Sequence, residues 1–407
     1  MIQQILKGAV YAIAFLVLMP FAQVHAEENR WFFSGFATLG AVRSNTNLAT
    51  FVMPGQTSGA TQSFDFGVDS KIGVQGTYKL NNQLSVTAQL ISKKNDQNNW
   101  SPKAEWLFGK IQPQANLSFR LGRIGFPVFS VSDFRDVNFA NLWTRPPLDV
   151  YGQVPLSHFD GADVIWDWPV GNAVLSTQFL MGQSRSSFQG MAIQSNSLVG
   201  MNATADFSNG IKLRFGQVKS KLSIQENEYF PILMTILPEI GFGNLAEQLN
   251  PYRRDSIFSG LGISYDEGRW IAMAEYTTRR NDGFLSDTSA WYATVGHRFG
   301  NITPYITLGQ RTVDSSNVVN VIPVTPIPEL ETLRLVIDDV IGTQRIGQRT
   351  VAIGLRWDVH RNISLKTQLE HVRTEKSGGR FPSGQFINLK PGFQGATLLG
   401  ISLDVLF

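Results

Sequence analysis

The sequence has 407 residues and a formal net charge of +3, and only 16% of its residues are Asp, Glu, Lys or Arg. That fraction is below the roughly 25% usual for soluble domains, and the small excess of charge, without a run of Lys or Arg, gives no support to nucleic-acid binding. Cysteine is absent, so stability must come from burial and backbone pairing and not from disulfides.

The first 26 residues have the pattern of a secretory signal peptide. Lys7 precedes a short apolar run, and Val24 and Ala26 place small residues three and one positions before Glu27. An uncleaved membrane anchor is the alternative, but Pro20 and the shortness of the run disfavour it. We predict a signal peptide over 1–26 and one exported domain over 27–407, in which no stretch approaches the ~18–20 apolar residues of a membrane-spanning helix.

The exported part is dominated by alternation of apolar and polar residues, the period of a β-strand whose two faces differ. Sixteen segments show it, in chain order 30–42, 69–80, 84–94, 102–113, 116–127, 163–170, 173–183, 197–207, 211–224, 259–268, 269–280, 288–299, 302–313, 349–359, 363–373 and 396–407. Tight turns such as Asn209-Gly210 and Gly300-Asn301 join successive pairs.

Long connections at 43–62, 128–162, 225–255 and 314–348 separate the hairpins. Short turns that alternate with long loops, and strands of ten to twelve residues, are typical of a transmembrane barrel. A soluble sandwich of this length would need linkers between domains, and the sequence has none. We therefore predict an all-β fold: a transmembrane antiparallel β-barrel of about 16 strands, with 18 left open as the alternative count.

Four segments resemble the Gram-negative outer-membrane porin superfamily: "FSGFATLG" at 33–40, "DSKIGVQGTYKLNNQLSVTAQL" at 69–90, "LSFRLGRIGFP" at 117–127 and "LLGISLDVLF" at 398–407. The resemblance implies a homotrimer of sixteen-stranded barrels in the cell outer membrane, in contact with lipid and lipopolysaccharide. It also implies that the third long loop folds into the lumen, and that Phe407 is an assembly signal read by the outer-membrane assembly machinery. The acidic PEFGG-like motif of the general porins is missing from 128–162.

Successive residues of a β-strand point to opposite faces, so the odd or even position of a residue in its strand, here called its parity, selects the side chains expected to line the pore. The basic candidates are Lys71, Arg120, Arg214, Arg298, Arg311, Arg356 and Lys366. Simple alternation turns Arg123 outward, whereas the family pattern places it on the inner wall, and a bulge at Gly122 would reconcile the two. We place Arg123 inside the barrel.

Asp133 and Asp136 of the third long loop are the expected acidic partners, together with Glu370 on a strand; Glu275 is a weaker candidate because it alternates with Ile271 and Met273. A basic wall opposite an acidic loop would create a transverse field at the constriction. The alternative interpretation is that these charges are scattered and solvated and balance one another.

The stretch 141–155 contains three prolines, which restrict the backbone. We interpret it as a rigid ledge in the pore that carries Trp143, Arg145 and Tyr151, with a loop that only fills space as the alternative. Two other connections, 229–249 and 327–342, are apolar enough to form short helices. They form either a lid or subunit contact, or a loop packed on the barrel's own rim.

The sequence shows no pattern for catalysis, a metal or another cofactor. His158, His297, His360 and His371 lack the spacing of a metal site, and no plug domain precedes the first strand. We predict a passive diffusion channel for small hydrophilic solutes, with anion preference and without enzyme activity. The alternatives are a channel selective for a small organic acid, phosphate or sugar, and a plugged structural or adhesive barrel.

Overall fold

The computed structural model describes residues 30–188, 191–225, 229–344, 346–375 and 385–407. The predicted signal peptide over 1–26 lies outside these residues. Among the described helices, none is long and apolar enough to cross a membrane.

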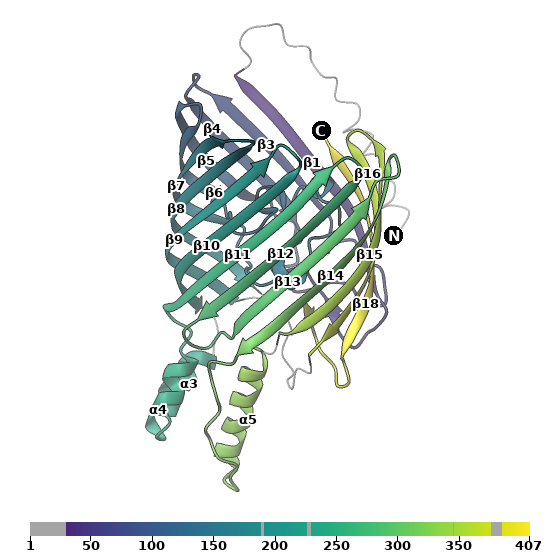
Figure 1. The fold of residues 1–407 in the computed structure, drawn as a ribbon. Coiled ribbons are helices and arrows are strands. Elements are labelled where there is room, and N and C mark those ends of the chain that lie inside the picture. The colour runs from purple at the N-terminus through teal and green to yellow at the C-terminus, as the bar shows by residue number, and fades with distance from the viewer. Residues whose placement is uncertain (1–29, 189–190, 226–228, 345, 376–384) are drawn as a thin grey trace.

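In the described part of the chain, sixteen antiparallel strands close into one barrel (Figure 1), which confirms the predicted fold class and the lower strand count. Around the barrel the strands are β1 (Trp31–Ser44), β3 (Lys71–Lys79), β4 (Leu84–Lys93), β5 (Lys103–Gln114), β6 (Leu117–Gly125), β7 (His158–Val170), β8 (Ala173–Phe188), β9 (Met191–Phe207), β10 (Ile211–Gln225), β11 (Arg254–Glu267), β12 (Trp270–Asn281), β13 (Asp287–His297), β14 (Ile302–Ser315), β15 (Gln348–His360), β16 (Ile363–Thr374) and β18 (Gly395–Leu406).

The barrel closes where β18 pairs with β1, with Phe36 opposite Leu406 and Ser44 opposite Leu398. The main chain of Phe407 extends the pairing, since its N–H donates to Gly35 O at 2.9 Å and its carbonyl accepts from Gly35 N at 2.6 Å. This is the seam predicted from the alternation in 396–407. Closure pairs the backbone groups of every strand, which an open sheet edge would leave unpaired.

Strand β15 shows how alternation separates the two faces of the wall. Val351 and Ile353 are exposed on the outer surface, whereas Thr350 and Ala352 are buried on the inner side. The outer face is therefore apolar and solvent- or lipid-facing, as expected for a barrel of this class.

The two ends of the barrel differ as predicted. Short turns, the start of β1 and the end of β18 lie at one end, here called the turn end, and the long connections lie at the other, the loop end (Figure 1). At the loop end, β2 (Thr50–Phe51) pairs with β17 (Phe386–Ile387).

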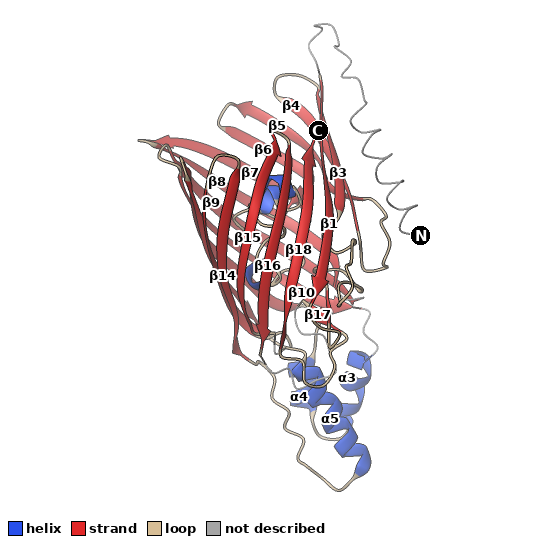
Figure 2. Cartoon of the chain, turned by 90° about the vertical axis from the view of Figure 1, so that its right-hand side faces the viewer, coloured by secondary structure: helices blue, strands red, loops and turns tan. Residues whose placement is uncertain are grey.

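Three helices confirm the prediction for 229–249 and 327–342: α3 (Tyr229–Glu239), α4 (Gly243–Leu249) and α5 (Pro328–Gly342). They project beyond the barrel at the loop end (Figure 2). Phe230, Leu237, Leu245 and Ile337 are buried in one apolar cluster, so the helices are held by packing against one another.

Strand boundaries differ from the prediction where the sequence is polar. Strands β8 and β9 reach Phe188 and Met191, well past the predicted limits of 183 and 197. β7 begins at His158, inside the predicted connection 128–162. These strand ends lack apolar alternation, and backbone pairing with the neighbouring strand extends them regardless of it.

Candidate functional site

The connection between β6 and β7, residues 126–157, folds into the barrel and is called the inner loop. It contains the short helices η1 (Ser132–Phe134), η2 (Asn138–Ala140) and α2 (Leu148–Tyr151). Its apolar side chains form a cluster with wall residues, including Phe129 against Phe258 and Trp143 against Tyr292. The inner loop is therefore packed against the wall and not free in the lumen.

Trp143 fixes the middle of the inner loop to β13 and β14. Its Nε1–H reaches the hydroxyls of Thr294 and Thr307 at 3.0 and 3.1 Å, and the side chain is buried. A buried indole N–H needs such a partner. The two threonines, which face each other across the strands, provide it.

Arg145 is the strongest electrostatic anchor of the inner loop. It binds Asp69 through Nη2 at 2.7 Å and Glu370 on β16 through Nη1 at 2.9 Å, and all three side chains are buried. Burial opposes the charge, but the two carboxylates outweigh it and raise the pKa of Arg145 above its usual value. Gly400 on β18 permits the close approach, since a Cβ there would lie 2.8 Å from Nη2.

Two predicted wall cations bind main-chain carbonyls of the inner loop. Lys366 Nζ donates to Asn138 O and Trp143 O at 2.5 and 3.1 Å and pairs with Asp404 at 3.1 Å. Arg356 Nη1 donates to Asn141 O at 2.9 Å and to a second loop carbonyl. Both side chains face inward, as parity predicts.

Arg145, Tyr151 and Lys366, which were predicted to line the pore, are almost fully buried, although Arg145 and Tyr151 contribute to the lining of one cavity. Their exposed fractions are 3%, 3% and 1%, because the inner loop covers the wall at these positions. Tyr151 donates its hydroxyl to Glu275 at 2.9 Å. Parity shows that a side chain points into a barrel, but it does not show whether a loop lies over it.

Asp136 is the acidic residue of the inner loop that faces basic wall residues. It lies 3.2 Å from Lys71 Nζ and 3.0 Å from Lys93 Nζ. Burial would raise the pKa of Asp136, but the two ammonium groups hold it well below its usual range. Asp133 is exposed and lies 4.0 Å from Arg214, so it contributes a weaker contact. Arg214 also donates to Pro127 O at 3.0 Å.

Arg120 and Arg123 do not pair with Asp133 or Asp136, the acidic partners expected from the sequence. Arg120 binds Asp163 with Nε–Oδ1 at 2.9 Å, and Arg123 binds Asp160 with Nε–Oδ1 at 2.8 Å. Both aspartates lie directly opposite on β7. Cross-strand register supplies these partners, and the sequence alone does not reveal it.

Arg123 lines a cavity inside the barrel, although the reason differs from the predicted bulge. Pairing of β6 with β5 and β7 continues without a shift on either side of Gly122. Gly122 has φ of 133° and faces Gly161 on β7. A glycine with positive φ within regular pairing takes the place of a bulge.

Sequence reasoning missed two wall residues, Lys93 and Arg279, and gave too little weight to a third, Glu275. Lys93 lies opposite Lys71 across β3 and β4 and was not predicted as a partner of Asp136. Glu275, which parity grouped with Ile271 and Met273, is buried and accepts hydrogen bonds from the inner loop, including Ser130 N at 3.1 Å. Arg279 on β12 donates to Gln153 O at 2.9 Å. An inward strand position near a loop was the only signal for each.

Cavities lie on both sides of the inner loop. The basic cavity, about 360 Å³ at the loop end, has eight basic and four acidic side chains among its described lining: Lys71, Lys93, Lys94, Lys103, Arg123, Arg135, Arg145 and Arg185, with Asp69, Asp96, Glu105 and Asp136. The turn-side cavity, about 770 Å³, is more balanced, with Arg120, Lys212, Arg214, Arg298 and Arg356 against Asp133, Asp206, Asp266 and Asp358.

A third cavity, the apolar cavity, has a volume of about 590 Å³ and also lies at the loop end. Residues 152–156 of the inner loop, strands β9 to β11 and helices α3 and α5 contribute to its lining. It shares Val154 and Pro155 with the basic cavity, so the two adjoin there. The predicted wall residue Arg311 lines it, whereas Arg298 lines the turn-side cavity.

The described residues contain no group of three or more His, Cys, Asp or Glu side chains placed to hold a metal ion. His158 is paired with Glu105 at 3.1 Å.

Comparisons with known proteins find no matching family model and no matching curated protein. Solved structures do match. OmpF of Salmonella typhi in complex with daunomycin aligns at 13% identity and a TM-score of 0.54, over 93% of this chain and 97% of that chain. The outer membrane channel DcaP of Acinetobacter baumannii aligns at 9% identity and 0.55, over 93% and 97%.

The anion-selective porin from Comamonas acidovorans aligns at 10% identity and a TM-score of 0.54, over 93% of this chain and 99% of that chain. At such identities the likeness concerns the fold. It confirms that this chain has the closed barrel of outer-membrane porins, as the four resembling segments predicted.

Proposed function

We propose that this protein is an outer-membrane channel through which small hydrophilic solutes diffuse, with a preference for anions. The loop end would face the outside of the cell and the turn end the periplasm. Support comes from the porin-like barrel, its apolar outer face and the polar cavities on both sides of the inner loop.

The observation that carries the anion preference is the basic cavity. All four of its acidic residues have a basic partner, such as Asp69 with Arg145 and Asp136 with Lys93. Among the described residues, Arg135 and Arg185 of this cavity have no carboxylate within 4.0 Å. Charges of one sign on low-dielectric walls concentrate the field and attract the opposite ion.

Reversal potentials in a KCl gradient across a planar bilayer test the proposal. The channel should give stepwise conductance with chloride more permeant than potassium. Arg185→Gln should lower the permeability ratio, by up to about fivefold because one charge at ~4 Å in water contributes about 1 kcal/mol. Arg349→Gln is the matched control, since Arg349 is exposed on β15 and lines none of the three cavities.

A channel that prefers potassium would contradict the anion preference. A bilayer without current would contradict the channel itself and favour the plugged structural barrel, since the inner loop already fills part of the lumen. Liposome swelling in small sugars would distinguish an open channel from a plugged barrel, because only an open channel lets the sugars enter and the liposomes swell.

We further propose that the channel is a homotrimer in lipid and lipopolysaccharide, inserted by the outer-membrane assembly machinery. The resemblance to trimeric porins supports this assembly. Analytical ultracentrifugation in detergent would measure the mass of the particle, and a monomer mass would contradict the trimer.

A further inference from the structure

The apolar cavity combines a hydrocarbon lining with cationic groups. Phenylalanines from four parts of the chain line it: Phe126, Phe230, Phe258 and Phe284. A concave, mainly apolar site with a few polar groups and a volume of ~300–1,000 Å³ is typical for binding a small molecule. Its volume of about 590 Å³ falls within that range.

Arg311 on β14 supplies one buried cation to the cavity and is 2% exposed. Its Nε donates to Ile346 O at 2.7 Å and its Nη2 to Gln348 Oε1 at 3.0 Å, both neutral acceptors. A guanidinium has five N–H groups. The two hydrogen bonds leave donors of Arg311, including those on Nη1, for another acceptor.

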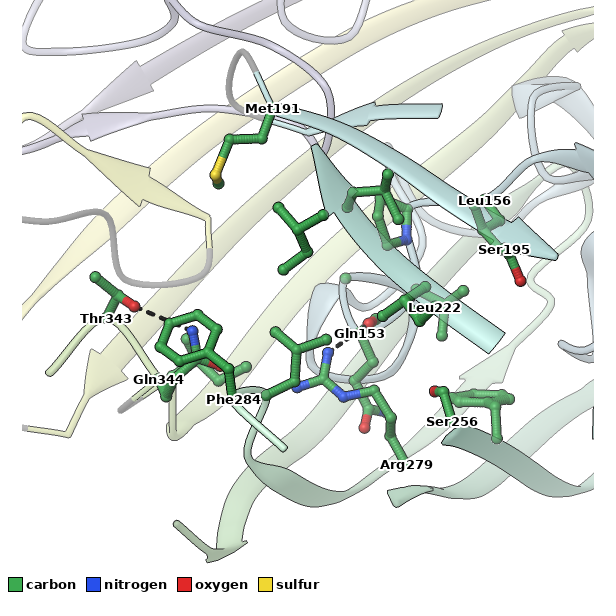
Figure 3. A pocket seen from close by; sticks show the side chains of 18 of the residues that line it. Gln153, Leu156, Met191, Ser195, Leu222, Ser256, Arg279, Phe284, Thr343 and Gln344 are labelled. Carbon is green, nitrogen blue, oxygen red and sulfur yellow. Dashed lines mark hydrogen bonds between the residues drawn. The ribbon is translucent and has the colours of Figure 1, made fainter. Parts of the chain in front are cut away.

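Arg279 on β12 supplies a second cation. It donates through Nη1 to Gln153 O at 2.9 Å and through Nη2 to Ser286 O at 3.2 Å, while its buried Nε has no partner in the described structure. In Figure 3 its guanidinium lies among Gln153, Leu222 and Phe284.

Neither guanidinium forms a direct ion pair with a described carboxylate. No carboxylate among them lies within 4.0 Å of Arg279 or Arg311. Asp339 on α5 is the single acidic residue of the described lining, so the lining carries a net positive charge. A buried charge without a counter-charge is costly, and an anion in the cavity would reduce that cost.

Ser195 on β9 adds a neutral polar group on the opposite wall. The side chain is 1% exposed, its Oγ has no hydrogen-bond partner in the described structure, and it lines the cavity. Figure 3 shows it beside Leu156 and across the cavity from Gln344. It offers a hydroxyl to a polar substituent of a bound molecule.

We infer that the apolar cavity binds a small aromatic carboxylate, with the ring against the phenylalanines and the carboxylate toward Arg279 and Arg311. An inorganic anion would leave the apolar lining in contact with water, and a neutral hydrocarbon would leave both cations unpaired. A molecule with both parts satisfies both surfaces. This inference rests on the proposed channel in one respect: the bound carboxylate is cargo, which enters the adjoining basic cavity at Val154 and Pro155.

Equilibrium dialysis of 2-naphthoate against the full protein in lipid nanodiscs tests the inference, with empty nanodiscs as background. Saturable binding is expected, and Arg311→Gln should weaken it about tenfold, the value of one hydrogen bond to a charged group. Arg349→Gln should bind like the wild type. Neutral 2-naphthamide should bind much more weakly, and inorganic phosphate should not compete.

Because Arg311 is buried, Arg311→Gln could lower binding by unfolding the barrel. A second variant that leaves the barrel wall unchanged is therefore needed. Val340→Trp on α5, beyond the barrel wall, fills the cavity from its helical side and should abolish saturable binding. Equal binding of naphthamide, effective competition by phosphate, or unchanged binding by Val340→Trp would each overturn the inference.

Conductance separates this inference from the proposed function. A channel that carries chloride but does not bind 2-naphthoate would overturn the inference and leave the channel standing. The opposite result is also informative. If 2-naphthoate binds saturably, Val340→Trp abolishes that binding and no current is seen in bilayers, the proposed channel would be contradicted and the carboxylate site would be supported.

Discussion

Arg145 of the inner loop and Asp69, two residues before β3, form a buried ion pair with Nη2–Oδ2 at 2.7 Å and Nε–Oδ1 at 3.1 Å. With Glu370 on β16, the pair joins the inner loop to both sides of the seam between β1 and β18. This contact helps to hold the inner loop in the lumen, together with the apolar cluster and the hydrogen bonds of Trp143, Lys366 and Arg356, since no strand pairing holds it there.

Replacing Arg145 should destabilise the barrel. Arg145→Met leaves Asp69 and Glu370 buried without a cation, and removing one partner of a buried ion pair typically costs about 3–5 kcal/mol. Guanidinium unfolding in lipid, followed by tryptophan fluorescence, should show this loss in the free energy of unfolding. Single-channel current should also become noisier as the inner loop loosens.

Arg334→Met is the control for this prediction. Arg334 on α5 also binds two carboxylates, Glu331 and Asp338, but at the surface, where ion pairs contribute little. Equal destabilisation by the two substitutions would show that the burial of Arg145 is not what matters.

The alternation of residues along each strand predicts much of this fold, whereas the pairing register between strands cannot be predicted from it. Alternation identified the strands, the closing seam and the inward direction of Arg120 and Lys366, because one-sided burial fixes each of them. The partners of Arg120 could not be found in this way, since Asp163 meets it only through the register of β6 on β7.

The inner loop limits the prediction of the candidate site. Its path has no period, so the sequence could not show that it covers Lys366 or that it turns Asp136 toward Lys93. The apolar cavity escaped prediction for the same reason: its lining comes from the inner loop, the wall and two helices that are distant in sequence.

The stability of the protein should depend on pH through Asp149. Burial raises the pKa of Asp149 above its usual 3.8, although hydrogen bonds from Gln348 and Thr350 oppose the rise. The folded chain therefore retains this proton at a pH where the unfolded chain has lost it. As pH rises from 3.8 through the raised pKa, the contribution of this group to stability falls, and above that pKa it levels off.

Asp149→Asn should remove that part of the pH dependence. The free energy of unfolding, measured from pH 4 to 7, should fall less steeply with pH in the variant than in the wild type. Parallel curves would contradict a raised pKa of Asp149.

Gly122 should be hard to replace. Its φ of 133° is unfavourable for other residues, and an added Cβ would lie 2.3 Å from Leu107 O. Gly122→Ala should cost about 1–3 kcal/mol from backbone strain, plus the clash. Gly109→Ala on the neighbouring strand β5 is the matched control, because its Cβ would meet nothing within 4 Å. Similar yields of folded, heat-modifiable barrel from both variants would argue against a special backbone at Gly122.

Substitution of Phe407 tests whether the end of β18 only closes the barrel or also acts as an assembly signal. Its ring lies over Gly35, where a Cβ would be 2.2 Å from Cε2, yet 42% of the residue remains exposed. The ring is therefore only partly buried, and Phe407→Ala should refold in detergent with only a modest loss relative to the wild type. If the assembly machinery reads Phe407, the same variant should reach the outer membrane of cells at a severalfold lower level.

Phe33→Ala is the control for this prediction. It removes an exposed aromatic ring from β1 at the same end of the barrel and should leave the cellular level unchanged. Comparable levels of the two variants in cells would show that Phe407 is a seam residue without a role in recognition.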